Sequence, residues 1–239
     1  MKNINLTLLL TLVLLACVQS AQAEQEWEFE ITPYLWATQL DSEVRVGEYS
    51  AGASLEFSDI VDTLEMGLMG QFEARKGRWS IYSDLVYFNL ADDQSLTPVT
   101  EISSDLKQTV SLVMAGYKPK NLEVLDIYFG VRYDKVEIDL DLNGAIIDRG
   151  LSSSVDWIDP VVGVRARYPL NDQWSLESQL FYSAGKADYT VLANAGVRWA
   201  FGEKWSSTFS YRFSDIDYDD ERGFKETSQG FMIAFGYRF

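Results

Sequence analysis

Hydrophobic and polar residues alternate along most of this chain, and no apolar run after residue 24 is long enough to form a membrane-spanning helix. Residues 205–213, for example, place Trp205, Phe209 and Tyr211 in one phase and serine, threonine and arginine in the other. A period of two is typical of β-strands with one apolar and one polar face. The pattern predicts about ten strands, near residues 27–38, 64–75, 79–90, 106–117, 124–142, 154–168, 174–184, 188–201, 205–218 and 227–239.

The connections between these segments alternate in length. Short turns with Gly, Pro or charged residues are expected at 76–78, 118–121, 169–172 and 202–204, and another tight connection near 185–187. Longer polar connections are expected around 41–63, 91–105, 143–154 and 219–226. Short turns at one end and long loops at the other are typical of outer-membrane barrels. We therefore predict an all-β fold, a closed antiparallel up-and-down transmembrane β-barrel of about ten strands, with eight or twelve as alternatives.

Aromatic residues mark the strand ends next to the short turns. Three tryptophans each open a strand there, and a tyrosine and a fourth tryptophan each lie near the end of one, all in the outward apolar phase. Such rings gather at the membrane–water interface because they are apolar but carry an N–H or O–H that requires a polar partner. We therefore assign the membrane-interface aromatics as Trp79, Tyr168, Trp174, Trp199 and Trp205.

Two segments fit the alternation less well. In residues 135–142 the apolar phase shifts by one position, which indicates either a bulge at the outer rim or a strand that projects beyond the membrane. Residues 42–62 alternate weakly and contain glycine, so we interpret them as an extracellular hairpin and loop and not as two more membrane crossings.

The chain ends on alternating large apolar residues, GFMIAFGYRF. We interpret this segment as the closing strand, which pairs with the strand that begins near Trp27 so that no edge is left open in the bilayer. Its last residues also resemble the C-terminal signal read by the outer-membrane assembly machinery, and we assign that signal to Tyr237 and Phe239.

The N-terminus has the pattern of a secretory signal. One lysine precedes an apolar run, and small residues at Ala21 and Ala23 form a cleavage site, so residues 1–23 are predicted to be the signal peptide and 24–239 the barrel. The alternative is a lipoprotein signal, in which Cys17 would be lipidated. Because Cys17 is the only cysteine, we expect no disulfide in the mature protein.

The charge and the residue types exclude several functions. The net charge of −16 leaves no basic patch for nucleic acid. The chain contains no histidine, which outer-membrane proteases, phospholipases and lipid A-modifying enzymes of similar size use as a general base. Because neither histidine nor a mature cysteine is available as a ligand, zinc chemistry is also not expected. We therefore expect no enzymatic activity, catalytic residues, cofactor or metal site.

Many charged residues share the inward phase of the predicted strands. Because a barrel of about ten strands is close to the size that side chains fill, we expect arginines and carboxylates to satisfy one another inside it, with a leaky lumen as the alternative. This predicted lumen polar network consists of Glu73, Arg75, Asp84, Arg132, Asp159, Arg165, Arg167, Glu177, Arg198 and Arg212. Further inward charges are Glu28, Glu30, Glu65, Lys107, Asp126 and Arg238.

Two acidic segments deserve comparison with metal sites. DLDLNG (139–144) has the opening spacing of a calcium loop, but Gly150 stands at the twelfth position where a bidentate glutamate belongs, so a turn with Asn-Gly at its tip is favoured. The acidic run at 215–221 could bridge lipopolysaccharide phosphates through divalent cations, but a solvated surface loop is the favoured interpretation.

Four stretches, PYLW (33–36), FSDIVDTLEMGLMGQFEARKGRW (57–79), WIDPVVGVRARYPL (157–170) and the terminal GYRF, resemble a family of little-characterised Gram-negative outer-membrane β-barrel proteins. The resemblance covers nearly all of the mature chain. It implies the barrel and its location in the cell outer membrane, and it implies no catalytic or binding residues.

We therefore expect an integral outer-membrane barrel with a structural or surface-interaction role. A small-solute channel is the main alternative, and a soluble or lipid-anchored periplasmic β protein is a third. The expected partners are outer-membrane lipids, lipopolysaccharide and the assembly machinery, and not nucleic acid; the oligomeric state is left open.

Overall fold

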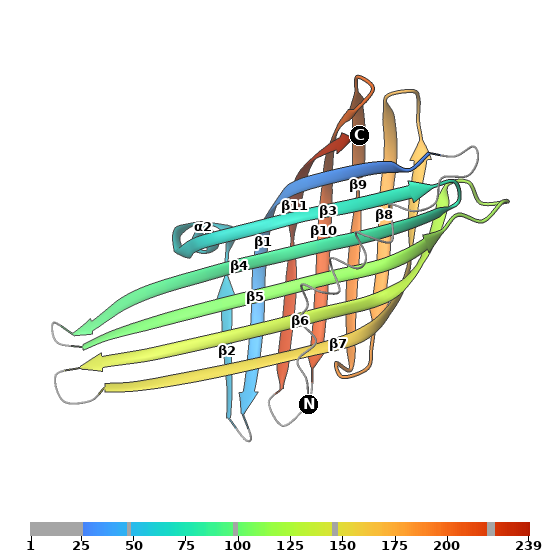
Figure 1. The fold of residues 1–239 in the computed structure, drawn as a ribbon. Coiled ribbons are helices and arrows are strands. Elements are labelled where there is room, and N and C mark those ends of the chain that lie inside the picture. The colour runs from blue at the N-terminus through green and yellow to red at the C-terminus, as the bar shows by residue number, and fades with distance from the viewer. Residues whose placement is uncertain (1–25, 47–48, 98–99, 145–147, 219–222) are drawn as a thin grey trace.

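The alternating segments form a closed antiparallel barrel of ten strands, with one further strand attached at the rim (Figure 1). The structure is a computed structural model that describes residues 26–46, 49–97, 100–144, 148–218 and 223–239. Its elements are β1 (Glu28–Val46), β2 (Tyr49–Leu55), α2 (Phe57–Thr63), β3 (Leu64–Lys76), β4 (Trp79–Thr97), β5 (Thr100–Tyr117), β6 (Leu125–Gly144), β7 (Asp148–Pro169), β8 (Trp174–Ser183), β9 (Tyr189–Phe201), β10 (Trp205–Tyr218) and β11 (Phe224–Arg238). The predicted signal peptide and Cys17 lie outside the described residues.

The last strand closes the barrel against the first, as the sequence predicted. β11 pairs with β1 from Glu30↔Arg238 to Val44↔Phe224. At the end of the chain Phe29 and Phe239 exchange two backbone hydrogen bonds, with N···O distances of 3.2 and 3.0 Å. No edge of the ten-stranded wall is therefore left open at the chain terminus.

Apolar side chains cover the outer surface of the barrel. Phe209 on β10 is 57% exposed, and its outward neighbours on β11 are also large and exposed. On β10 the outward apolar side chains extend from Trp205 to Phe213, and the next outward residue is Asp215. The length of this apolar stretch is close to the roughly 9–11 residues that a tilted transmembrane strand needs. None of the helices in the described part of the chain is long and apolar enough to cross a membrane. The outer surface therefore has the character and height of a lipid-facing band.

Several strands are longer than the alternation predicted. Residues 91–105 and 143–154, expected as loops, are mostly strand: β4 pairs with β5 out to Thr97↔Thr100, and β6 with β7 out to Asn143↔Asp148. Figure 1 shows β4 to β7 projecting well past β8 to β11 at the end opposite the short turns. The sequences of these outer ends are rich in polar residues, so they lacked the lipid-facing alternation on which the prediction relied. DLDLNG belongs to β6 in this projection, so the predicted turn at 139–144 was wrong.

The shifted phase at 135–142 results from this projection and not from a bulge. β6 keeps continuous register with both β5 and β7. Val136 and Trp157 point inward, 3% and 2% exposed, into an outer cluster of Val136, Trp157, Ala187, Ile216, Tyr218 and Phe224. The apolar side chains thus change from the outer face of the wall to the inner face of the projection, which is the pattern expected of a lipid-embedded wall and a water-exposed projection.

The segment 42–62 contributes no membrane crossing, as predicted. β1 continues to Val46, and its last part forms a hairpin with β2, which is not one of the ten strands of the closed wall. The chain then forms α2, a short helix that the sequence analysis did not predict. A capping box begins it: the side chain of Glu56 accepts from the backbone of Asp59, and the Asp59 carboxylate accepts from the Glu56 N–H at 2.9 Å.

Candidate functional site: the barrel lumen

Paired charges fill the lumen near the short-turn end. Four arginines and four carboxylates from β1, β3, β6, β7, β8 and β9 form what we call the charged layer: Glu30, Glu73, Arg75, Asp126, Arg165, Arg167, Glu177 and Arg198. Six of the ten residues of the predicted lumen network come together here. Arg238 at the end of β11 also lies 3.4 Å from Glu30, so acidic groups are not in excess here, although the whole chain is strongly acidic.

The contacts of the charged layer connect strands far apart in the sequence. Glu73 accepts from Arg75 and from Arg165, each at 2.7 Å. Arg198 donates two hydrogen bonds to Glu30, at 2.7 and 2.8 Å, and Arg167 donates to Glu177. Such bidentate, charge-assisted pairs are strong and geometrically specific. A cavity of only about 30 Å³ lies within this layer, the volume of about one water molecule.

An aromatic layer lies next to the charged layer, on its side away from the short turns. The rings of Tyr82, Tyr128 and Phe181 contact one another pairwise, with centroids 5.8 to 5.9 Å apart. The guanidinium of Arg165 stacks over Tyr82 at 5.4 Å and joins the two layers. Glycine makes room for the rings, since a Cβ on Gly163 would be 2.4 Å from the Phe181 ring. The side chains are thus packed across the lumen as in a protein core.

A buried ion pair completes this cross-section on the opposite side. Asp84, 1% exposed, accepts from Arg212 at 2.9 Å and from the hydroxyl of Tyr34 at 2.8 Å. Gln71 also donates to Asp84, at 3.3 Å. β1, β3, β4 and β10 contribute these groups, so that the contact between Asp84 and Arg212 reaches across the lumen from β4 to β10.

The structure places two predicted network residues elsewhere. Arg132 pairs with Asp134 at 2.7 Å through two hydrogen bonds, nearer the outer end. Asp159 has no part in the charged layer and instead accepts from the backbone N–H groups of Lys186 and Ala187, at 2.6 and 3.1 Å. It therefore anchors the β8–β9 connection. The alternation could not distinguish these roles. It predicts that a side chain faces the lumen, but it does not predict how far along the barrel axis that side chain lies.

An apolar cavity of about 320 Å³ occupies the outer half of the lumen. Its inward-facing lining includes Trp36, Val86 and Val110, and its lower end is formed by Arg212 and Tyr34. The alternation gave no signal for this cavity, because apolar residues in the inward phase are also what a filled lumen requires.

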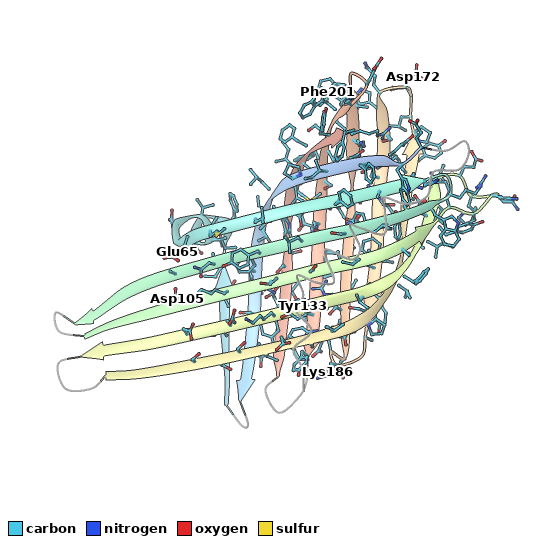
Figure 2. All side chains as sticks on the ribbon, in the orientation of Figure 1. Glu65, Asp105, Tyr133, Asp172, Lys186 and Phe201 are labelled. Atoms are coloured by element: carbon cyan, nitrogen blue, oxygen red, sulfur yellow. The ribbon has the colours of Figure 1, made fainter. Side chains whose placement is uncertain are left out.

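The five predicted interface aromatics all lie exposed on the outer surface at the short-turn end. Four of them have an aromatic neighbour on the adjacent strand: Trp79 lies beside Tyr117, Trp174 and Trp199 lie beside each other, and Trp205 lies beside Tyr237. In Figure 2, Asp172 and Phe201 mark this end of the barrel and Lys186 marks the opposite one. Phe239 stacks on Phe29 at 5.6 Å. The assembly role of Tyr237 and Phe239 stays a prediction.

The acidic run begins inside β10 and its first two acids have partners. Asp215 accepts from Tyr189 at 2.9 Å and from Thr227 at 2.8 Å, and Asp217 accepts from Lys225 at 2.7 Å. Residues 219–221 of the run lie outside the described residues. Among the residues that the structure does describe, no group of three or more candidate ligands is placed to hold a metal ion. In the projection, the Glu137 carboxylate lies 2.8 Å from Lys135 and raises the pKa of that ammonium group.

No protein-family model and no curated protein matches the chain. Among solved structures it is similar to Ail, the attachment invasion locus protein of Yersinia pestis, with a TM-score of 0.45 and 12% identity, covering 91% of this chain and 100% of that one. The translocator domain of autotransporter NalP from Neisseria meningitidis gives 0.42 and 13%, covering 98% and 95%. Neisserial surface protein A gives 0.32 and 11%, covering 91% and 100%. The barrel fold of this chain rests on its own strand pairing.

Proposed function

We propose that this protein is an integral barrel of the Gram-negative outer membrane with a closed lumen and a structural or surface-interaction role. The observation that carries the proposal is the continuous cross-section of the aromatic layer and the charged layer. Pairing of four arginines with four carboxylates stabilises a plug, whereas an ion-selective pore has a free path lined, for example, by backbone carbonyls or rings of charged side chains.

The outer surface supports the membrane location. Its apolar band has the height of a bilayer core, and exposed tryptophan and tyrosine side chains lie at the short-turn end. The projecting ends of β4 to β7 then extend beyond the band. Their outward side chains, such as Lys135, Glu137 and Asp156, suit polar contacts with lipopolysaccharide or with other molecules at the cell surface.

The same geometry gives no support to enzymatic chemistry. The chain has no histidine, and in the described lumen Glu73, Asp84 and Asp159 are engaged by arginine, tyrosine or backbone N–H groups. Glu226 instead accepts from Gln108 and Ser228. A carboxylate whose oxygens are already occupied by such donors does not suit a general acid or base.

The proposal is tested by the entry of small sugars into liposomes that contain the refolded mature protein. We expect the wild type to be impermeable and Arg165→Ala to admit arabinose, because that change removes a side chain that contacts both layers. Lys186→Ala, in the exposed β8–β9 connection, is the matched control and should stay impermeable. Rapid uptake by the wild type would favour the small-solute channel.

A further inference from the structure

The barrel wall has a weak seam between β1 and β3. The two strands pair only from Glu28↔Arg75 to Pro33↔Gly70, and β1 next pairs on that side with β2, from Leu40↔Leu55 onward. Within the described residues, 34–39 of β1 and 64–69 of β3 have no strand partner on the edges that face each other; we call this stretch the seam. Unpaired backbone groups are unfavourable in lipid, so the seam is the easiest part of the wall to open.

A bend in β1 produces the seam. Figure 1 shows the first part of β1 running beside β3 and the remainder turning away toward β2. Pro33 is the last residue of β1 that pairs with β3. On the other side of the strand, neither Thr32 nor Pro33 pairs with β11. Proline lacks the N–H that a ladder needs, so the strand loses a rung on its β11 side at this position and bends there.

The helix α2 lies against the outside of the wall at the seam. It contacts β1, β2 and β4, and its residues Phe57 and Val61 remain exposed. Beside it Leu35, 75% exposed, faces outward from β1, and Leu68 faces outward from β3. These apolar side chains suit the hydrocarbon of a bilayer, and the short helix α2 lies where the wall is unpaired.

The apolar cavity of the outer lumen continues through this seam. Its lining combines inward residues such as Val86 and Val110 with the outward Leu35 and with Phe57 and Val61 of α2. The cavity therefore joins the inside of the barrel to its lipid-facing surface. Since a methylene group is slightly smaller than a water molecule of ~30 Å³, a volume of about 320 Å³ accommodates a chain of roughly ten carbons.

Two hydrogen-bond donors lie at the inner end of the cavity. The Nε of Arg212 and the Nε1 of Trp36 are buried, have no hydrogen-bond partner and belong to residues of the lining. The guanidinium of Arg212, a residue only 2% exposed, stacks over Trp36 at 5.1 Å. Asp84 already balances the charge of Arg212, so the remaining donors favour a neutral oxygen acceptor over a second carboxylate.

We propose that this cavity binds one uncharged single-chain amphiphile of roughly ten carbons, taken from the bilayer through the seam. Its terminal hydroxyl or carbonyl oxygen accepts from Arg212 and Trp36, and its chain runs outward past Val110 to leave the wall beneath α2. The charged and aromatic layers block onward passage, so the site is a binding site and not a channel.

The test measures binding of radiolabelled 1-decanol to the mature protein refolded in phospholipid nanodiscs, after subtraction of partition into protein-free nanodiscs. We expect saturable binding of one molecule per barrel, with decane and decanoate each binding more weakly by at least twofold. Trp36→Phe keeps an aromatic ring but removes the indole N–H donor; it should weaken decanol binding roughly two- to tenfold and leave decane binding nearly unchanged. Unsaturable partition alone would overturn the proposal.

Cavity-filling variants test the location of the site. Val110→Phe adds volume at the centre of the cavity. Gly67→Phe does so at the seam, where an added Cβ meets only the Leu64 side chain, at 3.5 Å and beyond. Both should lower decanol affinity at least tenfold, whereas the lipid-facing control Leu180→Phe should not. Heat-modifiable gel migration identifies folded variants, and decanol binding retained by either folded filler would place the ligand elsewhere and contradict the proposal.

Discussion

At the residue scale, the pair of Asp84 and Arg212 shows what alternation can and cannot predict. The phase of each strand placed both side chains in the lumen. The sequence did not indicate that they would meet, because the contact joins β4 to β10 across the barrel and depends on closure. Asp159 shows the same limit: its inward phase was predicted, but its binding to the backbone of Lys186 depends on the height of a loop that alternation does not specify.

Removing one member of this pair should be more damaging than removing both. Asp84→Asn leaves the buried Arg212 charge uncompensated, and we expect a loss of about 3–5 kcal/mol in the free energy of unfolding. The double variant Asp84→Asn, Arg212→Met should recover part of that loss. Urea unfolding in lipid vesicles, followed by tryptophan fluorescence, gives both values, with the exposed Asp172→Asn as control. An Asp84→Asn protein as stable as wild type would contradict the assigned pairing.

At the element scale, the sequence predicted the strands within the lipid band well and those outside it poorly. β10 begins at Trp205 and ends at Tyr218 as expected, because lipid on one face forces strict alternation. The outer ends of β4 to β7 face water, so their polar residues resembled loops. α2 was missed because its seven residues are too few for a helical period to emerge.

The projection should depend on its own core. Trp157, at the centre of the outer cluster, stacks on Tyr218 with a centroid distance of 4.7 Å. Trp157→Ala should destabilise the outer ends of β4 to β7 by about 3–5 kcal/mol while leaving the membrane wall intact.

Limited proteolysis of vesicles that contain the Trp157→Ala protein distinguishes the two parts of the barrel. We expect rapid cleavage within the projection and an unchanged heat-modifiable band. The outward Ser154→Ala should behave as wild type. Resistance of the Trp157→Ala protein to protease would show that the outer cluster does not hold the projection together.

At the scale of the whole molecule, closure makes the chain terminus a structural element. Phe239 hydrogen-bonds to the backbone of Phe29 and stacks on its ring. Deleting Phe239 removes these contacts together with the predicted assembly signal, so we expect a several-fold loss of protein from the outer-membrane fraction. Deletion should also slow refolding in vitro, where no assembly machinery acts. Normal yield of the truncated protein would contradict both roles.

The central claim is that side chains close the lumen of this outer-membrane barrel, and single-channel recording in planar bilayers tests it most directly. The refolded mature protein, with its fold verified by heat-modifiable migration, should produce no conductance steps, because two side-chain layers cross its lumen. Arg165→Ala should introduce steps under the same conditions. Stable steps of uniform size from the wild-type protein would contradict the closed lumen.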